Sequence, residues 1–409
     1  MRRRDDMTFP HEEYVRRLSE LRARMKERLL DAVIISDPEN IMYLTDYQTT
    51  GYSFFQALVV PIDGDCWMVT RLLEESNVHA RTWVEVTRPF KDSGDAIQTL
   101  VDSLNEFGLI RGTVGYERNS YFLPAYQQDR IRGLFNKGRF IDCFGIVEEG
   151  RICKSKHEIK VMKRAAKATE AGMKAGIDVC NVGVSENEIA AEISAAMFRA
   201  GGEAPSVMPY VTSGPRTMIG HATWEGRKIE AQDHVFLEVG GCFRRYHTAM
   251  MRTVTLGDVS PEMESAERKM IQALDALHRE IQPGLTVSDA DKIARDIIES
   301  GEHGGELITR SGYSIGIAFP PSWDEGYILS LMQGDPTPFK VGMTFHLIPW
   351  IWGVNGKQTM GISDTIHITE TGCESFFSLD RAFTRKQTSS NVTTINSAKS
   401  RKTADAEKS

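Results

Sequence analysis

The chain lacks any long run of apolar residues. No stretch approaches the roughly 18 consecutive apolar residues that a membrane-spanning helix needs. The basic start MRRRDD is not followed by the apolar segment of a secretory signal peptide. The 409 residues are nevertheless 41% hydrophobic and 26% charged, as in ordinary core-forming proteins. We therefore expect a soluble cytoplasmic protein of two or three domains, at about 150 residues per domain.

Paired cysteines and an excess of positive charge are also missing. The six cysteines are scattered without CxxC or CxC spacing, so neither a disulfide framework nor a thiolate zinc site is expected. The net charge is −7 and the isoelectric point is near 5.9. Such a balance argues against bulk attraction to nucleic acid or to an anionic membrane. We expect neither of these among the partners.

Strand and helix signals alternate over the first 150 residues. Amphipathic spacing predicts a helix over Glu12–Arg28. The apolar run Ala32–Ser36, closed by Asp37-Pro38, indicates a buried strand that ends in a turn. The other expected elements are the strands Ala57–Val60, Cys66–Val69, Thr113–Tyr116 and Phe140–Asp142, and the helices Ala96–Phe107 and Tyr126–Phe135. This alternation predicts an α/β domain over residues 1–150.

A second unit begins near residue 151. Ser155 and Glu158 have the spacing of a capping box at the start of a helix over Ser155–Gly172. The elements expected after it are the helices Asn187–Arg199, Pro261–Ile281 and Val287–Ser300, and the strands Val235–Gly240, Tyr246–Leu256, one near Phe345 and Thr365–Ile368. This mixture predicts an α+β domain over residues 151–385. Residues 386–409 are polar and nearly free of aromatic residues, a composition typical of a disordered tail.

One strand of the second unit carries a carboxylate among apolar residues. Alternation over Val235–Gly240 places Glu238 on the face opposite to the valines and leucine that flank it. A buried glutamate is unfavourable unless it has partners. It is therefore either a catalytic carboxylate whose pKa its surroundings adjust, or one member of a structural ion pair with Arg244, Arg245 or Arg252.

Other side chains with possible chemical roles are spread over the second unit. His221 ends a loop interrupted by glycine and proline, a setting in which catalytic groups are common. His346 lies in an otherwise apolar strand. A single histidine is more often structural, and a single tryptophan more often belongs to the core, so only the combination carries weight. Further residues of this kind are Trp224, Tyr313, Trp323 and Asp364.

Taken in this order, the segments resemble the catalytic domain of the creatinase and aminopeptidase-P superfamily, which has the pita-bread fold. The resemblance covers about residues 154–380 and rests on the first helix (KSKHEIKVMKRA), the loop ending in His221, the strand pair around Glu238 and Arg252, the GYSIG segment from Gly312, and the closing strands. The segment SDPENIMYLTDY from Ser36 is similar to the smaller domain that precedes it in that superfamily. The resemblance implies an α/β plus α+β protein, with a small N-terminal creatinase-type α/β domain followed by a pita-bread catalytic domain.

The departures from the family pattern concern its metal ligands. Metallopeptidases of this fold hold two metal ions through two aspartates, a histidine and two glutamates. The corresponding positions here are Glu238, Ala249, Tyr313, Ile348 and Ser363. Alanine, isoleucine and serine are poor ligands for a hard divalent ion, and a single carboxylate cannot build a dinuclear site. The resemblance, with these departures, implies an enzyme without metal or other cofactor and disfavours an Xaa-Pro metallopeptidase.

Metal-free members of the superfamily cleave C–N bonds in small amidine-like substrates. The motifs HATW from His221, RYH ending at His247 and FPPSW ending at Trp323 resemble those of ectoine hydrolases more than those of creatinase. The implied small-molecule substrate is ectoine or 5-hydroxyectoine, opened to N-acetyl-2,4-diaminobutyrate. Another amidine or guanidino hydrolase, a metallopeptidase and a non-catalytic binding protein on this fold remain the alternatives.

The implied chemistry gives the candidate residues their roles. Glu238 would complement the amidinium charge and then act at C2, as nucleophile or as general base. His221 would move the proton, because an unperturbed imidazole can both accept and donate a proton near neutral pH. The expected substrate-binding residues are Arg216, Trp224, His247, Tyr313, Trp323, His346, Asp364 and Tyr52. The resemblance also implies a homodimer in which the small domain of one chain helps to close the cleft of the other, and the loop Tyr47–Phe54 is our candidate for that contribution.

Overall fold

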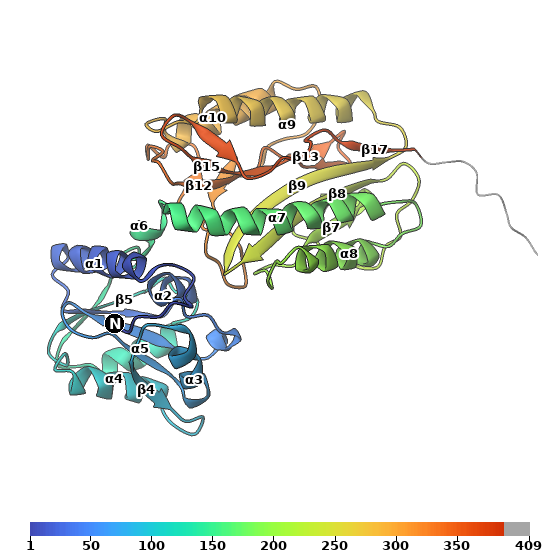
Figure 1. The fold of residues 1–409 in the computed structure, drawn as a ribbon. Helices are drawn as coiled ribbons and strands as arrows, with labels where there is room; N and C mark the ends of the chain where they lie inside the picture. The colour runs from blue at the N-terminus through green and yellow to red at the C-terminus, as the bar shows by residue number, and fades with distance from the viewer. Residues whose placement is uncertain (388–409) are drawn as a thin grey trace, which may run out of the picture.

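The computed structural model describes residues 1–387 and shows two parts joined by a short helix (Figure 1). The elements of the N-terminal part are α1 (His11–Glu27), β1 (Ala32–Ile35), α2 (Pro38–Thr45), η1 (Thr50–Ser53), β2 (Ala57–Pro61), β3 (Trp67–Arg71), α3 (Leu72–Arg81), β4 (Val86–Phe90), α4 (Ala96–Glu106), β5 (Thr113–Tyr116), α5 (Ala125–Leu134), β6 (Arg139–Asp142) and the connecting α6 (Glu148–Arg151). The strands form one mixed sheet in the order β4-β3-β2-β1-β5-β6. Residues of α4 and α5 pack on one face of this sheet, and residues of α1 and α2 pack on the other.

The second part holds two larger sheets between two pairs of helices, together with the two-stranded sheet β13-β14 (Figure 1). Its elements are α7 (Lys156–Val179), α8 (Glu186–Arg199), β7 (Tyr210–Ser213), η2 (Gly214–Met218), β8 (His234–Phe243), β9 (Tyr246–Leu256), α9 (Pro261–Glu280), α10 (Val287–Glu299), β10 (Gly312–Ser314), β11 (Ser330–Leu331), β12 (Thr344–Leu347), β13 (Ile351–Val354), β14 (Gln358–Met360), β15 (Asp364–Ile368), β16 (Cys373–Ser375) and β17 (Thr384–Lys386). One sheet has the order β17-β9-β8-β7 and is covered by α7 and α8, whereas the sheet β11-β10-β12-β15-β16 is covered by α9 and α10. The predicted α/β plus α+β class agrees with this arrangement.

Local sequence signals placed most of the long elements correctly. The capping box at Ser155 is formed, with its hydroxyl accepting the N–H of Glu158 and the Glu158 carboxylate accepting the N–H of Ser155. The predicted strand Tyr246–Leu256 has the bounds of β9. The turn predicted at Asp37-Pro38 is wrong, because Pro38 begins α2; proline suits the first helical position, whose N–H has no partner within the helix.

Two residues of the predicted tail, 386 and 387, are among the residues that the structure describes. Lys386 is the last residue of β17 and pairs in parallel with Leu256 of β9. A short polar strand of this kind is specified by its neighbour in the sheet rather than by apolar periodicity. The rest of the predicted tail, residues 388–409, lies outside the described residues.

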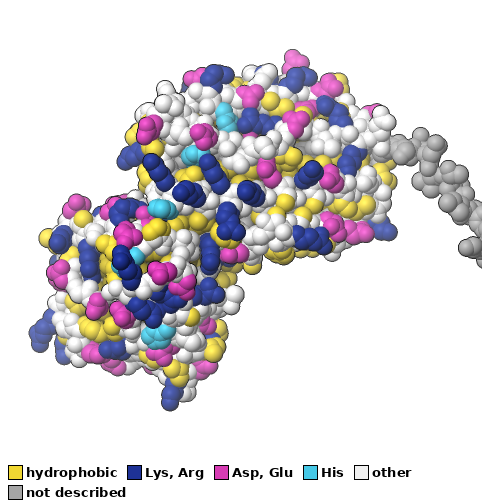
Figure 2. All heavy atoms as spheres, viewed as in Figure 1, with side chains coloured by type: hydrophobic (Ala, Val, Ile, Leu, Met, Phe, Trp, Pro, Cys, Tyr) yellow, Lys and Arg dark blue, Asp and Glu magenta, His cyan; other side chains and the backbone are white. Residues whose placement is uncertain are grey.

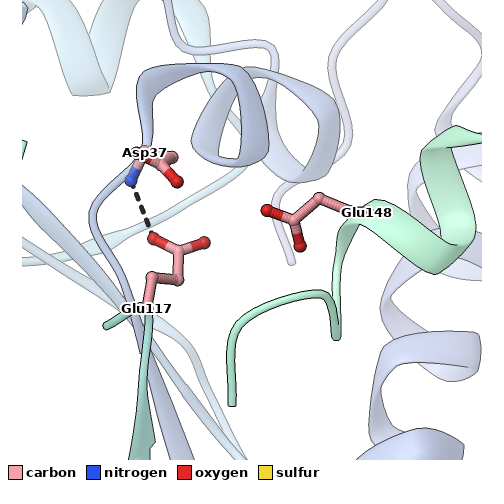
Figure 3. A group of neighbouring side chains, drawn as sticks. All are labelled: Asp37, Glu117 and Glu148. Atoms are coloured by element: carbon pink, nitrogen blue, oxygen red, sulfur yellow. Dashed lines mark hydrogen bonds between the residues drawn. The ribbon is translucent and has the colours of Figure 1, made fainter. Parts of the chain in front are cut away.

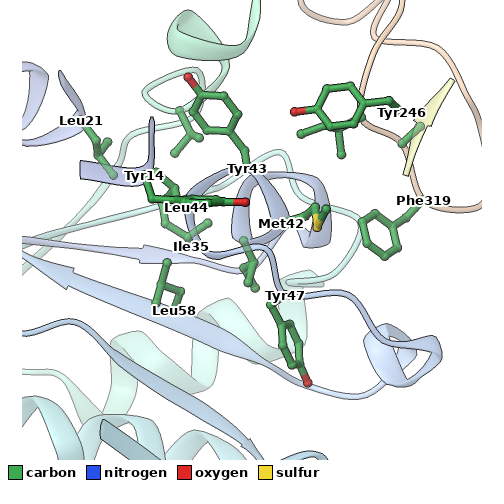
Figure 4. Packing of buried hydrophobic residues seen from close by; sticks show 14 of the residues in the cluster. Tyr14, Leu21, Ile35, Met42, Tyr43, Leu44, Tyr47, Leu58, Tyr246 and Phe319 are labelled. Atoms are coloured by element: carbon green, nitrogen blue, oxygen red, sulfur yellow. The ribbon is translucent and has the colours of Figure 1, made fainter. Parts of the chain in front are cut away.

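One apolar cluster extends across both parts. Tyr14 and Tyr43 belong to the N-terminal part, whereas Tyr246 and Phe319 come from the second, and all four are buried in this cluster (Figure 4). The Tyr246 hydroxyl donates to a carboxylate oxygen of Glu158 at 2.8 Å. Burial of large aromatic side chains contributes much of the energy of such contacts. The two parts therefore share one hydrophobic core.

Buried charges reinforce the junction. Arg151, at the end of α6, donates to Glu325 at 2.6 Å in the second part and to the Asn40 side-chain oxygen at 2.7 Å in α2. Asn40 in turn donates to Glu117 at 2.6 Å and to Glu148 at 2.9 Å.

Three buried carboxylates gather at this point: Glu117 and Glu148 lie close to Asp37, with a ligand-type oxygen from each within 4.8 Å of the others (Figure 3). Glu117 accepts the backbone N–H groups of Ser36 and Asp37 at the start of α2, so it serves as an anchor for that helix.

The solvent-exposed face of α7 carries positive charge. A row of Lys and Arg side chains covers α7 on the face visible in Figure 2, while positive and negative side chains are mixed over the N-terminal part. The row is the solvent face of an amphipathic helix whose opposite face, including Met162 and Ala165, is buried. Within residues 1–387, no helix has both the length and the apolar character that crossing a membrane requires.

Candidate active site

A cavity of about 1040 Å³ opens between β8, the β10 region and the loops that precede β7 and follow η2. Its wall includes the polar and aromatic residues Tyr210, His221, Glu238, Arg310, Tyr313, Trp323, Asp324, Trp350 and Trp352, together with Ile348. Four of the residues predicted from the sequence, Glu238, His221, Tyr313 and Trp323, thus line one space. They come from segments separated by up to about a hundred residues, and the sheet topology brings them together.

Glu238 reaches this wall because of the alternation along β8. Phe236 and Glu238 line the cavity, whereas Val235, Leu237 and Val239 are fully buried in the core beneath α7 and α8. The carboxylate of Glu238 takes part in no hydrogen bond or ion pair with residues 1–387, in contrast to the structural ion pair that we considered. Arg252, one of the proposed partners, pairs with Asp364 instead, as described below.

The surroundings of Glu238 favour its neutral form. Burial, and secondly the negative charge of Asp324, raise the pKa of Glu238 to about 8. A bound cation would reverse this effect, because an opposite charge nearby favours the carboxylate. Glu238 therefore has the properties of a group that becomes charged when a positively charged ligand arrives.

Asp324 is a second carboxylate on the cavity wall that the sequence did not single out as a site residue. One of its oxygens accepts from the Ser322 hydroxyl at 2.9 Å and lies 3.4 Å from Nη2 of Arg310, and the other accepts the N–H of Gly326 at 2.9 Å. The guanidinium of Arg310 also lies over the ring of Tyr313, 4.6 Å from its centroid. The segment SWDE contains this carboxylate, but no pattern in the sequence indicated that Asp324 lies near Glu238.

Aromatic rings form the wall next to Glu238. Trp323 packs edge-on against Tyr210, with ring centroids 5.7 Å apart, and Tyr210 is the cross-strand neighbour of Glu238. Trp323 fits because Gly240 has no side chain: a Cβ there would overlap the indole ring. A flat cation between such rings and a carboxylate gains both charge and cation–π attraction.

Tyr313 is tied into the protein by hydrogen bonds on two sides. The indole N–H of Trp323 donates to its hydroxyl oxygen at 2.9 Å, and Nδ1 of His346 lies 2.7 Å from the same oxygen. Nε2 of His346 lies 2.6 Å from the Ser363 hydroxyl. Burial, with Arg310 and Arg252 nearby, lowers the pKa of His346 to about 3, so its ring is neutral. His346 does not itself line the cavity and supports Tyr313 from behind.

His221 stands at the mouth of the cavity. It is exposed, it follows η2, and its backbone has φ +56°, a left-handed conformation that non-glycine residues adopt rarely. Its ring centroid lies 6.1 Å from that of Tyr210. Strained backbone conformations of this kind cluster at functional sites.

Four predicted substrate-binding residues have other partners and do not line the cavity. Arg216 pairs with Glu186 and Glu225, and Trp224 packs against the core beneath α8. Nε2 of His247 accepts the backbone N–H of Ser206, and its Nδ1 donates to the Arg245 carbonyl. Asp364 pairs with Arg252 and Arg381. These residues are polar or aromatic because the core needs them, which the sequence alone could not distinguish.

Tyr52 lies away from the cavity wall of its own chain. It makes edge contacts with Phe122 and Phe319, with ring centroids 5.7 and 5.5 Å apart. The loop around it forms η1, and Phe54 at its end is half exposed. A contribution of this loop to the site of a second chain remains a prediction.

The five positions that correspond to metal ligands do not fit a dinuclear metal site. Glu238 is the only carboxylate among them, Ala249 and Ile348 offer no donor atom, and the Tyr313 and Ser363 oxygens are engaged with His346. Within the described residues, the one group of three potential ligands is Asp37, Glu117 and Glu148 at the junction, and none of the three lines the cavity. These five side chains therefore do not supply the ligands of a dinuclear site.

Comparison with known proteins agrees with this architecture. Residues 160–370 match the model of metallopeptidase family M24, and residues 17–153 match the creatinase/prolidase N-terminal domain. The chain is 29% identical over 400 residues to the ectoine hydrolase of Halomonas elongata, covering 92% of this chain and 98% of that protein. It is 25% identical over 366 residues to the Xaa-Pro dipeptidase of Pyrococcus furiosus, covering 89% and 98%. The prolidase of Thermococcus sibiricus has the same fold, with a TM-score of 0.80 at 22% identity over 91% of this chain and 99% of that one.

Proposed function

Because this chain belongs to metallopeptidase family M24, with a creatinase/prolidase N-terminal domain, we propose that it is a hydrolase that opens the cyclic amidine ring of ectoine without a metal ion. 5-Hydroxyectoine is included in this proposal. The product is N-acetyl-2,4-diaminobutyrate. The similarity to the ectoine hydrolase of Halomonas elongata over nearly the whole chain supports this choice of substrate.

The observation that carries the proposal is the unpaired Glu238 on an aromatic cavity wall. A carboxylate whose surroundings raise its pKa to about 8 gains most from a ligand that brings a positive charge. An amidinium is such a ligand, and its flat ring suits the faces and edges of Tyr210 and Trp323. The loss of metal-binding side chains at the neighbouring positions removes the alternative use of this carboxylate.

The reaction needs an attack at C2 and a proton for the departing ring nitrogen. Glu238 either attacks C2 directly or removes a proton from a water molecule that attacks C2. In the direct route the C2–N bond breaks to leave an ester-type adduct, and water then attacks the Glu238 carboxyl carbon, so that the bond from this carbon to the bridging oxygen breaks and that oxygen stays on C2. In both routes one C–N bond breaks, and the nitrogen leaves as an amine after taking up a proton. His221, at the mouth of the cavity, is the proposed carrier of that proton.

A single-turnover experiment in ¹⁸O-labelled water separates the two routes. Direct attack places an oxygen from Glu238 in the first molecule of product, so the label appears in the protein carboxylate. Attack by water places the label in the first product molecule. Mass spectrometry of product and of the peptide that contains Glu238 reads both outcomes.

The proposal is tested by incubating metal-stripped protein with ectoine. We expect formation of N-acetyl-2,4-diaminobutyrate at an undiminished rate after exhaustive chelation. Activity that is lost on chelation and restored by manganese, iron or zinc would contradict the metal-free site. Cleavage of Xaa-Pro dipeptides would support the peptidase alternative, in line with the relative from Pyrococcus furiosus.

A related amidine or guanidino compound is the second candidate substrate. The cavity volume of about 1040 Å³ is at the upper end of the range of about 300–1,000 Å³ for pockets that hold drug-sized ligands. The space beyond Glu238, next to Trp350 and Trp352, would accept a substituent that ectoine lacks. Comparing kcat/KM for ectoine and for amidines with larger substituents distinguishes these candidates.

A binding protein on the same fold would need Glu238 and the aromatic wall but not His221. We expect His221→Ala to lower kcat by about 100- to 10,000-fold, as for a general acid–base group, with a small effect on the dissociation constant for ectoine. Binding without any turnover by the wild-type protein would support the non-catalytic alternative.

We also propose a homodimer in which the segment of residues 47–54 from the other chain helps to close the cavity. Phe54 is half exposed, and Tyr52 of the N-terminal part contacts Phe319 of the second part. A sedimentation or light-scattering mass near twice 45.9 kDa is expected. A monomer at micromolar concentration with full activity would contradict it.

A further inference from the structure

A chain of buried hydrogen bonds leads from the cavity wall into the second sheet. Tyr313 and His346 are direct cross-strand neighbours in β10 and β12, and the Tyr313 hydroxyl lies 2.7 Å from Nδ1 of His346. Nε2 of His346 lies 2.6 Å from Ser363, just before β15. His346 and Ser363 are fully buried. The backbone N–H of Met251 donates to the Ser363 oxygen at 2.6 Å and closes the inner end of the chain.

The hydrogen bonds that link Ser363, His346 and Tyr313 can be oriented in only two ways. A neutral imidazole has one N–H donor and one acceptor nitrogen. If Nε2 of His346 carries the hydrogen, Ser363 accepts from both His346 and Met251, and the hydroxyl hydrogen of Ser363 has no acceptor among residues 1–387. If Nδ1 carries it, Ser363 donates to Nε2 and His346 donates to Tyr313. A buried O–H without an acceptor is unfavourable, so the second direction is favoured.

This orientation determines whether the Tyr313 hydroxyl donates or accepts a hydrogen bond at the cavity. The Tyr313 oxygen accepts from Trp323 and from His346, which occupies both of its lone pairs. Its own hydrogen then has no acceptor in the part of the chain that the structure describes. Tyr313 lines the cavity together with Glu238. Since residues 1–387 provide no acceptor, a molecule bound in the cavity is the partner that this hydrogen can reach.

We propose that Ser363, His346 and Tyr313 form a one-directional relay that makes the Tyr313 hydroxyl an obligatory hydrogen-bond donor to the ligand beside Glu238. The ligand must then carry a lone-pair oxygen next to its cationic group. Such an oxygen is the substrate carboxylate, or the oxygen that becomes anionic when C2 is attacked. Tyr313 would touch the ligand, whereas Ser363 and His346 are positioning residues. The choice between these oxygens rests on the proposed hydrolase function, but the direction of the relay does not.

The direction is measured without any substrate. In protein labelled with ¹⁵N-histidine, long-range ¹H–¹⁵N NMR spectra distinguish the Nδ1–H from the Nε2–H form, and a His346→Gln sample assigns the signal. We expect the Nδ1–H form of His346 in the ligand-free protein. The Nε2–H form would overturn the proposal, whether or not the protein hydrolyses ectoine.

A double-mutant cycle tests whether Ser363 acts through Tyr313. We expect Tyr313→Phe to lower kcat for ectoine by about 100- to 1,000-fold, as for loss of one oxyanion donor. Ser363→Ala should lower it by about 10- to 100-fold, as for a residue that supports a directly acting group. Ser363→Ala should cause no further loss in the Tyr313→Phe background. Full additivity of the two losses would overturn the relay.

Thr253→Ala is the matched control for the loss of a buried hydroxyl. The Thr253 hydroxyl joins β9 to the same segment as Ser363 does, through the N–H and the carbonyl of Gly361, but touches no member of the relay. It should lower the melting temperature without changing kcat or the His346 signal. If the wild-type protein opens no amidine at all, the proposed function fails while the NMR result still decides the relay.

Discussion

Arg252 forms a buried ion pair with Asp364, with 3.0 Å between Nη2 and Oδ1. The other oxygen of Asp364 accepts from Arg381 at 2.8 Å. Arg252 also donates to the backbone carbonyls of Met251 and Ser363. Its donors are thus engaged in joining β9 to β15, so Arg252 does not neutralise Glu238.

This ion pair should be important for stability and not for catalysis. Asp364→Ala leaves Arg252 buried without its counter-charge, so we expect a loss of about 3–5 kcal/mol in the free energy of unfolding. The kcat/KM of the folded fraction should stay near the wild-type value. Asp296→Ala, which breaks the exposed pair with Lys292, is the control and should have little effect on unfolding. A stable Asp364→Ala protein with weakened substrate binding would instead support a substrate contact.

The pH dependence of activity should follow Glu238. Its raised pKa of about 8 means that the free enzyme must lose a proton before the carboxylate can act, so kcat/KM should rise with pH through about 8. Asp324 contributes to the raised pKa, so Asp324→Asn should move this rise to lower pH. A kcat/KM that stays constant from about pH 6 to about pH 9 would mean that another group controls the reaction.

The junction carboxylates should make stability depend on pH in a defined direction. Burial, then the charge of Glu39, raise the pKa of Asp37 to about 7 from its usual 3.8. The folded state therefore binds this proton more tightly than the unfolded state. The contribution of Asp37 is most favourable below about pH 4, weakens as the pH rises, and is lowest above about pH 7.

Asp37→Asn keeps the shape and removes this titration. In urea unfolding, its stability relative to wild type should improve as the pH is raised from about 4 to about 8. Asp129→Asn, at an exposed position, is the control and should show no such trend. A difference between Asp37→Asn and wild type that does not change with pH would show that Asp37 is already ionised in the folded protein.

Local patterns in the sequence were sufficient for much of the fold. The alternation around Glu238, the capping box at Ser155 and the length of β9 all depend on residues close together in the chain. The candidate site was only partly predictable for a physical reason. The proximity of Asp324 to Glu238, and the contact of His346 with Ser363, depend on the order and register of β10, β12 and β15, which no local pattern specifies.

The most direct test of the central claim is Glu238→Gln, assayed for ectoine hydrolysis and for thermal stability on one preparation. Glutamine keeps the shape and removes the charge, and because Glu238 has no ion-pair partner among residues 1–387, the melting temperature should stay near that of wild type. Turnover should fall by at least about 100- to 10,000-fold. Asn187→Asp, an exposed substitution on α8, controls for a single charge change away from the cavity. A well-folded Glu238→Gln protein that opens ectoine at nearly the wild-type rate would contradict the account.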